Sequence, residues 1–122
     1  MRPNAEQTAV LIATLLHRSR ERRARISERT VRILSRRRPL RDVFKEKLRA
    51  ELDDLGIHLV QLERGGFGLI PTRALDGAPA ITAKKYVLDE VKKVKKGVDD
   101  GFFERLRNKI TNDTEEGEED DE

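Results

Sequence analysis

Apolar residues recur at spacings of three and four in the first part of the chain, which indicates amphipathic helices. One such stretch follows Asn4, a residue type that caps helices well. Another follows Ser27, a second good cap, with Glu28 placed favourably in the first turn. The apolar positions that define the two helices are Ala5, Ala9, Leu11, Ile12, Leu15 and Leu16 in the first, and Val31, Ile33 and Leu34 in the second.

The clearest helix lies between Pro39 and Gly56. Pro39 disfavours helical geometry at Arg38 and has no N–H to donate, so we expect a turn there and a new helix from Leu40 or Arg41. Gly56 is a natural C-terminal stop. The apolar positions of this helix are Leu40, Val43, Phe44, Leu48, Leu52 and Leu55. The sequence therefore predicts two helices on either side of a tight turn.

A β-hairpin is predicted directly after this helix. Residues 57–62 are mostly β-favouring or apolar, Gly65-Gly66 supplies a turn, and residues 67–70 form a return strand that Pro71 ends. The fold class predicted for the chain is therefore mainly α with a small β-hairpin.

The remainder is expected to be a turn or linker followed by two helices. Residues 76–79 form the linker, Thr82 caps a helix through Lys96, and Asp99 or Asp100 caps the last helix. That helix is too short to be stable alone, so its apolar edge needs a partner surface, and we favour a homodimer over packing on the chain's own core. The edge comprises Phe102, Phe103, Leu106 and Ile110.

Three regions follow from this reading: residues 1–76, a helical extension over 77–111, and a tail over 112–122. The tail holds eight carboxylate residues and no apolar side chain, which predicts disorder. Solubility is its simplest role. A sharper hypothesis is that it acts as a weak DNA mimic on the arginine-rich first part of the chain.

Charge is distributed unevenly. Residues 1–50 hold 15 Lys and Arg against 5 Asp and Glu, whereas residues 98–122 hold 3 against 11. A concentrated basic surface attracts polyanions, and most of this one is Arg, whose planar fork suits phosphate and guanine edges.

The order of these elements resembles a winged helix-turn-helix domain over about residues 5–75. The resemblance rests on the Pro39 break, the Gly65-Gly66 hairpin and a basic stripe along the helix between them. The stripe consists of Arg38, Arg41, Lys45 and Arg49, which are separated by three, four and four residues. In such domains the helix after the turn enters the major groove of DNA and the wing approaches the backbone or the minor groove. The resemblance implies that double-stranded DNA contacts Arg36, Arg37 and Arg38 at the turn, Arg41, Lys45 and Arg49 on the helix, and Arg64 and Arg73 on the wing.

The function expected on this resemblance is that of a transcriptional regulator, or of a DNA-binding accessory of a plasmid, phage or chromosome-maintenance system. The main alternative is a protein-interaction adaptor on the same scaffold, and a third is RNA binding, for which the aromatic platform is missing. Each of two further basic segments has two possible roles. Arg18 to Arg25 is either a solvated connector or a phosphate-contacting arm, and Lys92 to Lys96 either binds phosphate or compensates a helix dipole.

An enzyme is not expected. Asp76, Glu90 and Lys92 have the order of a metal-dependent nuclease site, but the last two lie in a helical pattern, where positions two apart point in different directions. His17 and His58 lack clustered partners, so neither a metal nor a cofactor is predicted. With no Cys and no apolar run long enough for a bilayer, we expect a cytoplasmic, nucleoid-associated protein and no membrane.

Overall fold

The computed structural model describes the backbone of residues 1–120 and the side chains of residues 1–112. The chain divides into two compact units, Met1–Pro79 and Ala80–Glu122. This division lies close to the boundary expected between residues 76 and 77. Each unit is described by itself.

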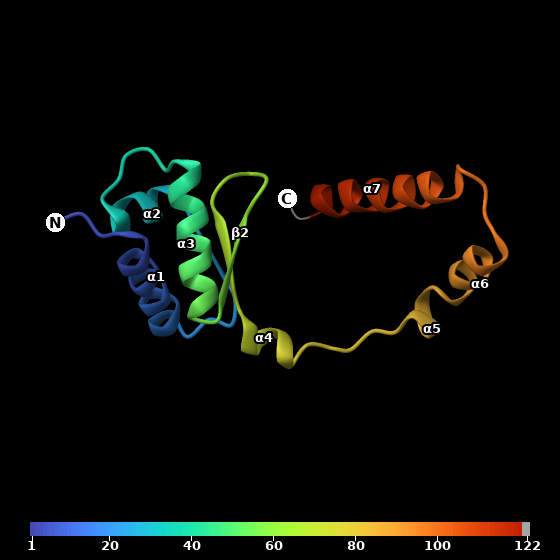
Figure 1. Ribbon diagram of the computed structural model, residues 1–122, viewed down its shortest axis with the longest axis horizontal. Coiled ribbons are helices and arrows are strands. Elements are labelled where there is room, and N and C mark those ends of the chain that lie inside the picture. Colours follow the sequence, from blue (N-terminus) through green and yellow to red (C-terminus); the bar gives the residue numbers. More distant parts are fainter. Residues whose placement is uncertain (121–122) are drawn as a thin grey trace. The chain divides into compact units, whose positions relative to one another are not determined.

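The first unit packs helices on one side of a small sheet (Figure 1). Its three strands are antiparallel in the order β1-β3-β2, so the last strand in sequence is the central one. The prediction of a mainly helical fold with a small hairpin is confirmed. The elements are α1 (Ala5–Ser19), β1 (Ala24–Ile26), α2 (Glu28–Ser35), α3 (Asp42–Asp54), β2 (Ile57–Gln61), β3 (Phe67–Pro71) and α4 (Thr72–Asp76).

The two helix caps predicted in this unit are confirmed. Asn4 Oδ1 accepts a hydrogen bond from the Gln7 N–H at 2.8 Å, and the Gln7 side chain accepts one from the Asn4 N–H at 3.0 Å. Ser27 Oγ likewise accepts from the Thr30 N–H at 3.0 Å. These bonds satisfy donors that the first helical turn leaves free, and they fix where α1 and α2 begin.

The predicted break and stop around α3 are also present. α3 begins at Asp42, slightly later than the expected Leu40 or Arg41, because Arg41 is the extended N-cap residue. At the other end Gly56 has a φ of +76°, a conformation that favours glycine, and its N–H donates to the Asp53 carbonyl oxygen at 2.9 Å.

The core lies where α1, α2 and α3 meet the sheet. Five apolar residues that were expected on buried helix faces are exposed instead: Leu11, Leu15, Ile33, Val43 and Leu55 have exposed fractions of 41%, 41%, 63%, 68% and 48%. The reason is that each helix buries a single narrow face, and these residues lie beyond its edge. The buried apolar residues are Ala9, Ile12, Leu16, Val31, Phe44, Leu48, Leu52, Ile57, Leu59, Phe67 and Leu69.

Strand β1 was not predicted, because its sequence lies within an arginine-rich connector. Ala24 is paired with Leu69 and Ile26 with Phe67, while the exposed Arg25 between them points to solvent. Residues 24–26 therefore alternate as an edge strand does. The connector between residues 18 and 25 is thus partly a strand of the sheet.

The second unit comprises α5 (Ala83–Tyr86), α6 (Leu88–Lys96) and α7 (Phe102–Asp120). The Thr82 cap is confirmed, since its Oγ1 accepts from the Lys85 N–H at 3.3 Å. The prediction of one helix through Lys96 is wrong, because Val87 adopts a φ of −132° and separates α5 from α6. Asp76, expected in a turn, belongs to α4.

Most of the acidic segment, residues 112–120, has its backbone in α7. Its side chains beyond Asn112 and the whole of residues 121–122 lie outside the described residues, so disorder of the tail stays a prediction. In the described part of the chain, every helix is too short or too polar to cross a membrane.

Candidate nucleic-acid interface

The turn between α2 and α3 is built from backbone hydrogen bonds around a left-handed arginine. Arg36 has a φ of +56°, its N–H donates to the Ile33 carbonyl oxygen at 3.4 Å, and the Arg37 N–H donates to the Arg32 carbonyl oxygen at 3.1 Å. Helices that end with this pair of bonds usually have glycine at the left-handed position. Here the backbone holds the turn, and the Arg36 side chain is exposed.

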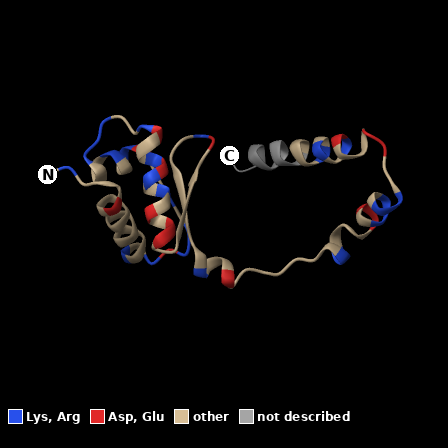
Figure 2. Ribbon diagram, viewed as in Figure 1, with Lys and Arg blue, Asp and Glu red and all other residues tan. Residues whose placement is uncertain are grey.

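Arginines gather around this turn, as Figure 2 shows for the segment between α2 and α3. They border an open hollow whose apolar member, Ile33, has an exposed fraction of 63%. Within the described side chains of residues 1–112, one of them, Arg32, pairs with a carboxylate, Glu28, at 3.6 Å. We define the turn cluster as Arg29, Arg32, Arg36, Arg38 and Arg41.

Arg37 lies in the same segment but has a different environment. Its guanidinium carbon is 4.1 Å from the centre of the Phe44 ring, and its Nη2 donates to the Pro3 carbonyl oxygen at 3.3 Å. Burial, and then the charge of Arg2, lower the pKa of this guanidinium from its ordinary value. Arg37 therefore fastens the N-terminal segment to α3, and less of its side chain is free for a ligand.

The basic stripe expected along α3 is only partly exposed. Arg38 precedes the helix and Arg41 caps it, so helical spacing does not align them with the later residues. The Lys45 side chain has an exposed fraction of 17% and its Nζ lies 3.6 Å from Asp42. Arg49 is bound twice, to Glu46 Oε1 at 2.7 Å and to the Leu59 carbonyl oxygen at 3.3 Å.

The outward face of α3 presents other residues. Because Phe44, Leu48 and Leu52 face the core, the opposite side of a 3.6-residue helix is occupied by other positions. They are Val43, Glu46, Lys47 and Ala50, and all four are exposed. Lys47 was not predicted as a site residue. The spacing of Phe44, Leu48 and Leu52 alone would have defined the buried face of the helix, and Lys47 lies outside that face.

The hairpin tip carries Arg64, which is exposed. Gly66 beside it has a φ of +80°, and a Cβ there would lie 2.8 Å from the Ile26 carbonyl oxygen. The Leu62 N–H donates to the Gly66 carbonyl oxygen at 3.0 Å, which closes the turn. The tip therefore packs against the end of β1.

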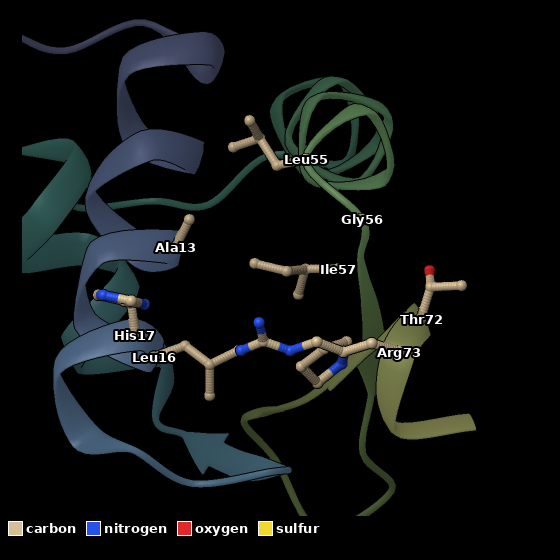
Figure 3. A pocket seen from close by; sticks show the side chains of 9 residues that line it. Ala13, Leu16, His17, Leu55, Gly56, Ile57, Thr72 and Arg73 are labelled. Carbon is tan, nitrogen blue, oxygen red and sulfur yellow. The ribbon is translucent and has the colours of Figure 1, made fainter. Parts of the chain in front are cut away.

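Arg73 does not lie on the hairpin. It belongs to α4 and borders a cavity of about 410 Å³ together with Leu16 and His17 near the end of α1 (Figure 3). The turn cluster is at the other end of that helix, because Arg37 contacts Pro3 just before α1 begins. The structure thus brings Arg36 and Arg38 together at one hollow, places Arg41 at the start of α3, and puts Arg73 at a different hollow.

The residues considered for metal-dependent catalysis are not gathered by either unit. Asp76 ends α4 in the first unit, whereas Glu90 and Lys92 lie two apart on α6 in the second. His58 is engaged locally, with Nδ1 3.4 Å from Asp53 and Nε2 3.1 Å from the Thr72 hydroxyl. Among the described residues there is no group of three His, Cys, Asp or Glu placed to hold a metal ion.

No protein-family model matches the chain, and no curated protein or solved structure is significantly similar to it.

Proposed function

We propose that the first unit is a winged helix-turn-helix domain that binds double-stranded DNA. The order helix, strand, helix, helix, strand, strand and the sheet order β1-β3-β2 support this assignment. In it, α2 and α3 are the two helices of the helix-turn-helix, α3 enters the major groove, and the hairpin β2-β3 is the wing.

The observation that carries the proposal is the turn cluster beside the start of α3. Arg29, Arg36 and Arg38 are exposed, and the N-cap residue Arg41 makes no side-chain hydrogen bond to the free N–H groups of the first turn. Arginine forks and the N-terminus of a helix both favour phosphate. We assign phosphate contacts to this cluster and, on the wing, to Arg64.

Base selectivity is assigned to the outward face of α3. Lys47 can donate to guanine O6 or N7, and Val43 and Ala50 can contact thymine methyl groups. Arg49 instead orients α3 against the hairpin by donating to the Leu59 carbonyl oxygen, and Lys45 is held within α3 by Asp42.

Duplex DNA is favoured over single-stranded RNA by the placement of the aromatic residues. In residues 1–79 the two Phe side chains, Phe44 and Phe67, are buried with exposed fractions of 9% and 1%. Recognition of single-stranded RNA uses exposed aromatic rings on which bases stack. The first unit therefore offers cations and a helix, which suit a duplex.

The second unit is proposed to make a homodimer. Phe102 and Phe103 pack edge to face with ring centres 5.2 Å apart, and Phe103 and Ile110 have exposed fractions of 58% and 66%. A dimer would present two recognition helices to two half-sites, as dimeric helix-turn-helix regulators do. Regulation of transcription and an accessory role in plasmid, phage or chromosome maintenance both fit such a protein.

Two matched lysine substitutions test the assignment of the recognition face. Lys47→Ala is expected to weaken binding to a selected DNA site by about 1–3 kcal/mol and to relax its base preference. Lys45→Ala removes the same charge from a side chain that is mostly covered, and it should leave base preference unchanged. Selection of sites from a random duplex library, followed by affinity measurements, gives both results. Equal preferences for all three proteins would refute the assignment.

A further inference from the structure

The first unit has a second basic surface at the C-terminal end of α1. Two adjoining hollows there, of about 270 Å³ and 550 Å³, share His17, Arg20 and Arg73 in their walls. Glu21 is the one acidic residue that borders them. We define the α1-end cluster as His17, Arg18, Arg20, Arg22 and Arg73.

The arginines of this cluster are free to bind a ligand. Within the described side chains of residues 1–112, the four arginines of the α1-end cluster form no ion pair, whereas Arg32 and Arg49 do. All four are exposed. A guanidinium that is not already paired keeps its full set of donors for a phosphate group.

The backbone at Arg20 gives an independent indication. Arg20 caps α1 with a φ of +62°, and its N–H donates to the His17 carbonyl oxygen at 3.3 Å. In the described part of the chain, Arg20 and Arg36 are the two residues other than glycine with positive φ. A side chain kept at a position that favours glycine suggests a function for that side chain, and each basic surface contains one.

The two surfaces are separated by the stretch of α1 from Ala5 to Leu16, which has no basic residues. α1 has 15 residues, which corresponds to a length of about 22 Å at about 1.5 Å per residue. From Ala5 to Leu16 it contains no Lys or Arg, and its exposed side chains include Val10, Leu11 and Leu15. The far end of α3 is acidic, with Asp53 and Asp54 exposed. Neither helix provides a row of cations along which one duplex could continue.

We propose that the α1-end cluster binds the phosphate backbone of a second DNA duplex, so that one protein molecule bridges two duplexes. This inference rests on the proposed function, because the first duplex occupies the turn cluster and α3. The contacts at the second surface are to phosphate, so binding there is independent of sequence and sensitive to salt.

Capture of a second duplex tests this proposal. A biotinylated duplex on beads is incubated with the full chain, and retention of an unrelated fluorescent duplex is measured at low salt. The variant Arg20→Gly/Arg73→Gln is expected to retain at least fivefold less fluorescent DNA while its affinity for a single duplex falls less than twofold. Its Tm should not decrease, because glycine suits the backbone at residue 20.

Two further variants control this result. Arg107→Gln/Lys109→Gln removes the same number of charges from exposed residues of α7 and should bridge normally. Arg18→Gln/Arg22→Gln leaves the helix cap untouched and should lose bridging as the first variant does.

Three results would overturn the proposal. The wild-type chain could bind one duplex without capturing another, in which case the proposed function would stand and this inference would fail. The α1-end variants could bridge normally, which would assign bridging to a protein dimer. Binding of a single duplex could fall as far as bridging does, which would place the cluster in the first DNA site. Absence of any duplex binding would instead refute the proposed function itself.

Discussion

Neighbouring arginines of the same turn have different environments, and therefore different expected roles. Arg36 is exposed and adopts left-handed backbone geometry, whereas Arg37 contacts Phe44 and the Pro3 carbonyl oxygen. The sequence alone shows three consecutive arginines and does not distinguish their roles. Their environments differ because the left-handed backbone at Arg36 changes the direction of the chain, so that Arg37 and not Arg36 contacts Phe44.

Replacing Arg36 by glycine should separate stability from binding. Relief of the left-handed conformation is worth about 1 kcal/mol, and the greater freedom of glycine in the unfolded chain offsets part of it, so we expect stability to rise by about 0.5 kcal/mol. Loss of one phosphate contact should reduce the salt slope of DNA binding by about 1. Urea denaturation and a salt titration measure the two effects. Arg36→Lys, the control, should change neither, and a less stable glycine variant would contradict the geometry.

Replacing Arg37 by alanine should affect stability more than DNA binding. It removes the contact with the Phe44 ring and the hydrogen bond to Pro3, so stability should fall by about 1–2 kcal/mol. The salt slope of DNA binding should change less than in Arg36→Gly. Thermal unfolding and the same titration decide this, and a stable variant with a strongly reduced slope would mean that Arg37 contacts phosphate directly.

At the scale of elements, the sequence predicted what local chemistry decides. Asn4 and Ser27 cap helices, Pro39 lies in the non-helical turn between α2 and α3, and Gly56 ends α3. Each of these residues acts through its own backbone or its nearest neighbours. Strand β1 was missed, since Ala24 and Ile26 become a strand only by pairing with β3, far along the chain.

The sequence likewise predicted which segments form the candidate site, but not every residue that they expose. The sequence located the arginine-rich turn, the following helix and the tip of the hairpin. It misplaced Arg73 and overlooked Lys47, because the orientation of α3 depends on which residues meet the core, and Val43 and Leu55 suggested a broader buried face than the helix has.

Glycine at the tip of the β2-β3 hairpin should be needed for its packing against β1. Gly66→Ala forces a Cβ to within 2.8 Å of the Ile26 carbonyl oxygen at a φ of +80°. We expect a loss of about 1–3 kcal/mol, with weakened pairing of β1 to the sheet. Gly65→Ala is the matched control, because its φ of +99° is strained too but nothing lies within 4 Å of its Cβ. Hydrogen exchange of the β1 amides should rise in Gly66→Ala alone, and equal exchange in both variants would contradict the packing.

For the whole molecule, opposed charges at the two ends of the chain are the dominant feature. Residues 1–50 carry 15 Lys and Arg, whereas residues 113–122 hold eight carboxylates and no cation. Electrostatic attraction between a protein and DNA depends on the total charge distribution as well as on direct contacts, and it is screened by salt.

Removing residues 113–122 should therefore strengthen binding to DNA of any sequence. The increase in affinity is expected to be large at low salt and to diminish as salt is raised, while unfolding of the first unit stays unchanged. Fluorescence anisotropy at a series of salt concentrations measures this. A variant in which the ten residues are replaced by Gly and Ser keeps the chain length, and unchanged affinity in both variants would exclude the tail as a competitor of DNA.

Binding of labelled duplex DNA across a salt series, with single-stranded DNA and RNA as competitors, decides whether the first unit is a duplex-binding domain. We expect duplex to be preferred over both competitors. The logarithm of the affinity should fall by about 0.9 per phosphate contact for each unit of the logarithm of salt concentration, and Arg36→Gly/Arg38→Gln should lower this slope by about two contacts. If the chain does not bind duplex at low salt, the proposed DNA-binding function is wrong, and the first unit is instead a scaffold for a protein partner.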